Sequence, residues 1–219
     1  MSCLPGMPGF VGSTPAYAFH NTPFFSTTNT DQYTDSNVSL GPPRQDRRVI
    51  VAIAAASGSS ARTILSVTVG GIPLDEDRFS RNTGNSENGH VAIYSGIIPN
   101  AASADVVVTW SAAMLSTMFG VYTAVGMINN ALFHSDSGGS SAQPFAINVP
   151  AKGFVVGCGI HITSGSPSWS GISQNGVTGS EADRRHSIAS LGPLNAETGR
   201  SISAGAGGTP SRFAVASYG

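Results

Sequence analysis

The chain has 219 residues and a formal net charge of −1, and only 11% of its residues are charged. This near-neutral charge, with no long run of one sign, argues against broad attraction to nucleic acid. A charged fraction below the roughly 25% of typical soluble domains has two explanations, a β surface rich in Ser, Thr and Gly or a surface lying partly against other subunits.

The first 45 residues are predicted to form an extended N-terminal arm, because repeated prolines disfavour both a helix and a central strand. No basic n-region or long apolar run marks a secretory signal or a membrane helix, so we expect a soluble protein made in a cytoplasm. The arm is too aromatic for a purely solvated tail. It either packs on its own domain, contributing an edge strand, or reaches a neighbouring subunit, or stays disordered. The large rings of the arm are the residues predicted to contact a neighbouring subunit: Phe10, Tyr17, Phe19, Phe24, Phe25 and Tyr33.

Residues 47–74 are the stretch around which the rest is predicted to be organised. Residues 49–54 are apolar on both faces of a period-2 pattern, which is typical of a central strand covered on both sides. After a Ser/Gly turn, Leu65, Val67 and Val69 alternate with Ser66 and Thr68, as in a strand with one wet face. We therefore expect residues 47–74 to form a β-hairpin at the centre of the fold.

Three further strands are predicted in the first half, at residues 90–98, 105–110 and 117–128. A long polar connection, residues 73–89, precedes them. It holds the densest acidic cluster of the chain, Asp75, Glu76 and Asp77.

The second half is predicted to open with a short strand at residues 145–149 and a long one at residues 153–162. Cys158 lies within the long strand as a small buried side chain, and with Cys3 as the only other cysteine no disulfide framework is indicated. Gly157 and Gly159 share one face of this strand, where they would let a ring or another backbone come close. The two halves of the sequence share a weak similarity, because a strand is predicted to open after a basic residue both at Arg48 and at Lys152.

Shorter strand segments follow to the end of the chain, giving roughly ten candidates and no convincing amphipathic helix. This pattern predicts an all-β protein, a β-sandwich with the jelly roll as the favoured topology. We expect two parts, an extended arm over residues 1–45 and a sandwich domain over residues 46–219.

No constellation of residues predicts catalysis. The five histidines show no metal-binding spacing, and the glycine-rich segment 205–208 lacks the strand and helix of a phosphate-binding loop. Asp75, Glu76 and Asp77 are oxygen ligands of the kind calcium favours, but Arg78 and Arg81 can neutralise them. We therefore predict no catalytic, metal or cofactor site.

Trp169 is the one candidate for a ligand platform, because an exposed indole ring can stack on a sugar. A tryptophan at the start of a strand more often covers the core. Both interpretations are open at this point.

Several strand phrases resemble those of small virion proteins of tailed bacteriophages. They are residues 48–55, 64–74 with the turn Val69-Gly70-Gly71, 91–94, 98–99, 105–110 and 213–218. The resemblance spans about residues 47–218, leaves out the arm and carries no functional residue. It implies a jelly-roll or immunoglobulin-like sandwich that decorates the head, cements capsomers, or forms spikes, fibres or tail accessories.

The function expected from this resemblance is that of a non-enzymatic virion structural protein, first of all a capsid decoration or cement protein. Ten arginines beside the single Lys152 are more typical of an assembled protein, since arginine tolerates partial burial. The expected partners are the major capsid protein or tail and neck components, and further copies of the chain, for which a trimer is one arrangement. Neither nucleic acid nor membrane is expected. The alternative is a tail or spike module that binds a host glycan.

Overall fold

The computed structural model describes residues 16–82, 88–126, 132–139, 142–162, 167–177, 184–205 and 211–219. The described part of the chain consists of strands and connections, and contains no helix, so the all-β prediction is confirmed. The first half carries β1 (Ala16–Ser26), β2 (Thr30–Ser39), β3 (Arg48–Ser57), β4 (Ile64–Val69), β5 (Ile72–Pro73), β6 (Asp75–Arg81), β7 (Asn88–Ile97), β8 (Ser103–Met114) and β9 (Ser116–Val125). The second carries β10 (Leu132–Gly138), β11 (Ala142–Val149), β12 (Phe154–Ile162), β13 (Ser168–Ser170), β14 (Ser173–Val177), β15 (Arg184–Leu191), β16 (Glu197–Gly205) and β17 (Ser211–Tyr218).

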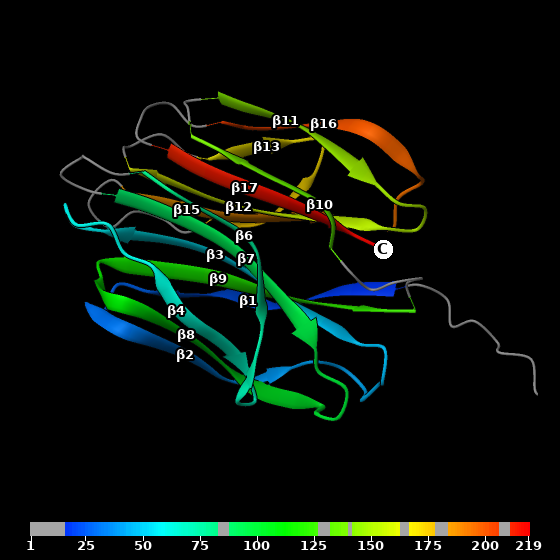
Figure 1. Cartoon of the computed structure of the whole chain (residues 1–219), viewed down its shortest axis with the longest axis horizontal. Helices are drawn as coiled ribbons and strands as arrows, with labels where there is room; N and C mark the ends of the chain where they lie inside the picture. Colours follow the sequence, from blue (N-terminus) through cyan, green and yellow to red (C-terminus); the bar gives the residue numbers. More distant parts are fainter. Residues whose placement is uncertain are drawn as a thin grey trace, which may run out of the picture.

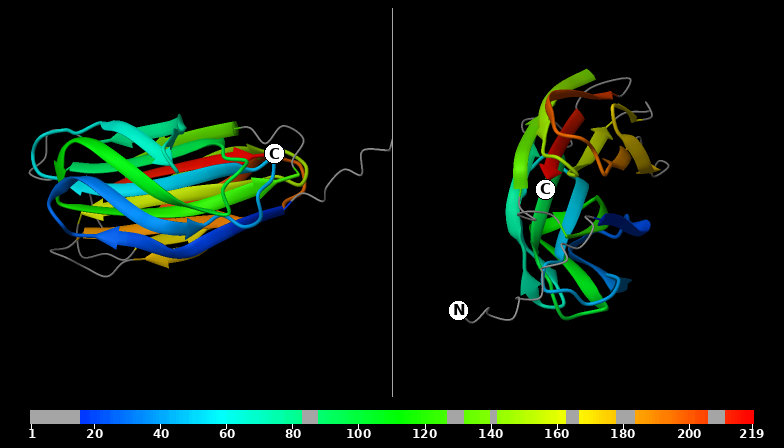
Figure 2. Two further views of the ribbon diagram at one scale, coloured as in Figure 1. Left: turned by 90° about the horizontal axis from the view of Figure 1, so that it is seen from below. Right: turned by 90° about the vertical axis from the view of Figure 1, so that its right-hand side faces the viewer.

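These strands form four antiparallel sheets stacked as layers. The first half contributes a first outer sheet, in the order β2-β8-β4-β5, and a first inner sheet, β1-β9-β3-β7-β6. The second half contributes a second inner sheet, β10-β17-β12-β15-β14, and a second outer sheet, β11-β16-β13. The two inner sheets face each other, so the halves are stacked, with the second half above the first in Figure 1 and in the right-hand view of Figure 2.

Three apolar cores separate the four layers, and β3 shows why. Its side chains Val49, Val51 and Ile53 pack toward the first outer sheet, whereas Ile50 and Ala52 pack toward the second inner sheet. The period-2 alternation of a strand gives both faces apolar side chains, and both are buried. The prediction of a central strand covered on both sides is confirmed. A third core lies between the sheets of the second half.

The two halves repeat one strand order. In each inner sheet the opening strand lies beside the closing strand, β1 beside β9 and β10 beside β17, and the central strand follows, β3 or β12. The outer sheets β2-β8-β4 and β11-β16-β13 correspond in the same way. The strands that open after Arg48 and Lys152 are thus the central strands of equivalent sheets. The strand order divides the chain into these two halves. A boundary at residue 45, as expected from the sequence, would separate β1 and β2 from the strands β9 and β8 with which they pair.

The hairpin expected over residues 47–74 is wrong. β3 pairs with β7 and β9, whereas β4 pairs with β8 and β5 in the other sheet of the same half. The reason is burial: β3 needs cover on both faces, and β4 has one wet face that suits an outer sheet. Residues 58–63 therefore carry the chain from one layer to the next.

The described part of the arm belongs to the sheets. β1 pairs with β9 along an edge of the first inner sheet, and β2 pairs with β8 along an edge of the first outer sheet. This arrangement is the first of the three alternatives for the arm, the edge strand packed on its own domain.

Candidate functional site

The aromatic residues predicted as an intersubunit contact lie against the chain's own sheets, except Phe10, which is outside the described residues. Tyr33 is only 2% exposed, and its hydroxyl donates to the carbonyls of Thr28 and Met114 at 2.7 and 3.0 Å. The other four rings are partly buried, and each packs on a ring of the two inner sheets: Tyr17 on Phe154, Phe19 on Tyr122, Phe24 on Phe119 and Phe25 on His186. These five side chains fix β1 and β2 in place, and the contacts they make are internal.

Trp169 covers the core of the second half. Its ring meets Phe213 edge-on, with centroids 5.7 Å apart, and its indole N–H donates to Ser187 Oγ at 3.1 Å. A Cβ built on Gly157 would lie 2.9 Å from the Trp169 ring. The close approach predicted for the strand glycines is confirmed. The indole is already engaged on its edge and on its N–H, which favours the core interpretation over the ligand platform.

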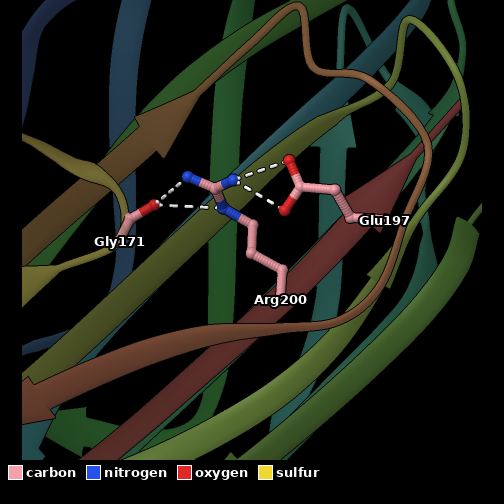
Figure 3. A network of polar contacts seen from close by, with 3 residues as sticks. All are labelled: Gly171, Glu197 and Arg200. Atoms are coloured by element: carbon pink, nitrogen blue, oxygen red, sulfur yellow. Dashed lines mark hydrogen bonds and ion pairs between the residues drawn. The ribbon is translucent and has the colours of Figure 1, made fainter.

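The turn that follows Trp169 is held by the polar network of Figure 3. Arg200 donates to both carboxylate oxygens of Glu197 at 2.9 Å and to the carbonyl of Gly171 at 2.7 and 3.2 Å. Gly171 has a φ of +80°, and a side chain there would collide with the Ser201 carbonyl. The network is a structural clamp between the β13–β14 turn and β16.

The three acidic side chains at the start of β6 lie in different environments. Glu76 accepts a hydrogen bond from the Tyr94 hydroxyl at 2.9 Å, and Asp77 accepts one from the Tyr218 hydroxyl at 2.6 Å, while Asp75 is exposed. Burial raises the pKa of Asp77 above its ordinary value. Among the described residues no group of three His, Cys, Asp or Glu side chains is placed to hold a metal ion.

Three buried histidines are each hydrogen-bonded to a serine hydroxyl near one end of the stack. His90 meets Ser57 at 2.9 Å, His186 meets Ser116 at 3.1 Å, and His161 meets Ser211 at 2.6 Å. Burial lowers the pKa of His90 to about 4 and that of His186 to about 3. Both are neutral at pH 7, and the serine contacts give them a structural role.

A cavity of about 290 Å³ lies between β1, the end of β9 and the β2–β3 connection. Sequence reasoning missed it, because its residues are scattered and form no motif. The lining residues are Ala16, Tyr17, Ala18, His20, Leu40, Gly41, Pro42, Arg44, Arg47, Thr123 and Val125, and none of them is acidic.

Arg47 gives this cavity a buried positive charge. Its side chain is 1% exposed, and its guanidinium donates to the carbonyls of Leu40, Gly41, Pro42, Ile98 and Ala101. Among the described residues no carboxylate pairs with it, since nearby Asp46 binds Arg44 at 2.7 Å. Burial, and next the charge of Arg47, lower the pKa of His20. The cavity is therefore the best-formed candidate site in the described part of the chain.

Comparisons with known proteins add no relative. No family model, no curated protein and no solved structure matches the chain. Within the described ranges no helix is long and apolar enough to cross a membrane.

Proposed function

We propose that the protein is a non-enzymatic structural component of a bacteriophage virion, most specifically a capsid decoration or cement protein. The observation that carries the proposal is the double-sided build of the molecule. Two stacked halves direct their outer sheets to opposite sides, so one molecule can contact two neighbours at once. The strand phrases that resemble phage virion proteins lie in both halves.

Part of each outer face suits contact with another protein because the side chains there are short and uncharged. In the first outer sheet Thr34, Val107 and Thr68 form one row across three strands. In the second, the exposed residues Ser168, Ser170, Ala146 and Ser201 lie on neighbouring strands. Short side chains lose little rotamer freedom on contact, so flat faces of this kind can be covered at low entropic cost.

The strand order supports the jelly-roll interpretation of each half. Counted within the second half, the inner sheet runs 1-8-3-6-5 and the outer sheet 2-7-4. Interleaving the first and last strands in this way is how a jelly roll folds its two Greek keys. We infer a tandem of two jelly-roll-like units, an architecture suited to a particle surface. Assembly as a homo-oligomer is part of the proposal, and light scattering on the purified protein tests it.

The function is tested by placing charges on the outer faces. Particles are produced from a phage genome that carries either Ser170→Glu with Ser201→Glu or Thr34→Glu with Thr68→Glu. The matched control is Asn195→Glu with Ala196→Glu, two exposed positions outside the outer sheets.

We expect mass spectrometry of purified virions to detect the wild-type and control proteins, and to find either outer-face variant depleted at least about fivefold. Electron microscopy would place the protein on the head or the tail. Absence of the wild-type protein from virions would refute the proposed function, and equal incorporation of all variants would refute the outer faces as contacts.

A further inference from the structure

We propose that the cavity between β1, β9 and the β2–β3 connection binds a small organic carboxylate, with the apolar body of the ligand in the cavity and its charge directed toward Arg47. This inference is independent of the virion proposal, because it rests only on the residues that line the cavity.

The charge of the cavity selects an anion. A buried cation is costly unless an opposite charge compensates it, and the carbonyls around Arg47 satisfy its hydrogen bonds without cancelling its charge. Arg44 also lines the cavity, but its charge is already paired with Asp46. A carboxylate entering the cavity would supply the compensating charge that the described residues lack.

His20 is placed to orient the carboxylate. Its Nε2 lies 2.5 Å from the Thr123 hydroxyl, and its Nδ1 has no hydrogen-bond partner among the described residues. If the hydroxyl donates to Nε2, the neutral ring carries its proton on Nδ1. Nδ1 is then a donor for a ligand oxygen. An uncharged alcohol of the same shape would be attracted much less strongly than a carboxylate by the positive charge of Arg47.

The size and lining of the cavity determine the size and the apolar character of the ligand that fits it. A volume of about 290 Å³, at roughly 30 Å³ for a group the size of water, admits a ligand of about ten non-hydrogen atoms. Tyr17, Leu40, Pro42 and Val125 supply an apolar wall. An inorganic anion would leave this wall uncovered, so a carboxylate with a compact apolar body is the better fit.

Benzoate is a suitable probe, and benzyl alcohol is its neutral counterpart. We expect titration calorimetry and amide NMR shifts on the full-length chain to show saturable benzoate binding, at least about tenfold tighter than benzyl alcohol. The affinity for benzoate should fall as salt is raised, since a ligand near the surface is partly screened. The shifts should map to β1, β9 and the β2–β3 connection.

Two variants separate this site from non-specific binding. Ala16→Trp places a ring at an exposed lining position and should abolish benzoate binding, whereas Ala146→Trp adds the same ring to an exposed position of β11 and should leave it unchanged. Circular dichroism checks that both variants fold. No saturable benzoate binding, equal affinity for benzyl alcohol, or unchanged binding by Ala16→Trp would each overturn the proposal.

Discussion

Two glycines of β12 leave room for large aromatic rings in the core of the second half. Gly157 and Gly159 lie on one face of β12, and side chains there would meet Trp169 and Phe213. Since protein interiors are close-packed, an added methyl group must displace a ring or shift the strand. The rings in turn close the core between the second inner and outer sheets.

Gly157→Val should lower the free energy of unfolding by about 3 kcal/mol, because the new side chain collides with the Trp169 ring and with Ile172. Urea denaturation followed by circular dichroism measures the change. Gly58→Ala is the matched control, since a Cβ at Gly58 meets nothing within 4 Å and should change stability by less than about 0.5 kcal/mol. An equally mild effect of Gly157→Val would contradict this account of the close approach.

Acid should destabilise the protein through the buried histidines. The pKa of His90 is about 4 in the folded state and near 6.5 when unfolded, so below pH 6.5 the unfolded chain binds the proton first. The stabilising contribution of the neutral ring is complete above pH 6.5 and is lost progressively as the pH falls toward 4, by up to about 1.4 kcal/mol per pH unit.

Unfolding free energies measured at several pH values for wild type and His90→Gln check this expectation. The variant cannot titrate at residue 90, so its stability should depend less steeply on pH between 6.5 and 4. Parallel curves for the two proteins would show that His90 is not responsible.

Predictions for single residues were confirmed where the two-residue alternation of side chains along a strand is unbroken. The glycines of β12 are such a case. Leu65 is the contrary case: it was expected on the apolar face with Val67 and Val69, but it is 67% exposed. The register of β4 shifts between Ile64 and Ser66, so the extra residue turns outward. A bulge has no marker in this stretch, so alternation alone could not reveal it.

At the scale of elements, two equivalent bulges connect the halves. The register of β6 against β7 shifts around Asp77, and that of β14 against β15 shifts around Asn175. Asp77 accepts the Tyr218 hydroxyl at 2.6 Å, and Asn175 accepts the Tyr122 hydroxyl at 3.1 Å. Each half thus provides an acceptor at an edge bulge and a tyrosine that reaches the other half.

The two tyrosine contacts should differ in strength. Tyr218→Phe removes a donor from a largely buried carboxylate and should cost about 2 kcal/mol, because hydrogen bonds to charged groups are the stronger ones. Tyr122→Phe should cost about 1 kcal/mol, because its acceptor, the side-chain amide of Asn175, is uncharged. Denaturation of the two single variants measures the difference, and a larger cost for Tyr122→Phe would reverse our ranking.

Strand positions were largely predictable from the sequence, but strand pairing was not. The apolar runs located β3, β7, β8, β9 and β12. Pairing depends on which layer each strand joins, and the short turn between β3 and β4 suggested a hairpin that the burial of β3 forbids. The cavity escaped prediction for a similar reason, since Arg47 and His20 meet only after β1 joins the sheet.

At the scale of the whole molecule, the core between the inner sheets belongs to both halves. It contains Ile50 and Tyr122 from the first half and Phe154 and Tyr218 from the second. Separating the halves would expose this apolar surface to water, which is unfavourable in proportion to its area. The sequence contained a faint signal of the duplication, the strands after Arg48 and Lys152, but the contact between the halves lies in the tertiary structure.

The halves should therefore unfold in one cooperative transition. Trp110 lies in the core of the first half, and Trp169 packs on the core of the second. The variant Trp169→Phe therefore keeps Trp110 as a fluorescent reporter of the first half, and Trp110→Phe keeps Trp169 as a reporter of the second. We expect each variant's fluorescence midpoint in urea to coincide with its own midpoint by circular dichroism. A fluorescence transition separated from the circular dichroism transition of the same variant would mean that the halves are independent units.

The role of the arm in attachment must be tested without removing strands. Deleting residues 1–41 would take away β1 and β2, and with them the rings that pack on Phe119, Tyr122 and Phe154, so loss of attachment would report only unfolding. Deleting residues 1–15 keeps both strands and removes Phe10, the one predicted contact residue outside the described ranges. We expect this variant to retain its circular dichroism spectrum and to be depleted from purified virions, with Phe10→Ala showing a smaller depletion. Wild-type incorporation of both variants would remove Phe10 from the interface and leave the outer sheets as the proposed contacts, because the remaining predicted rings already pack within the chain.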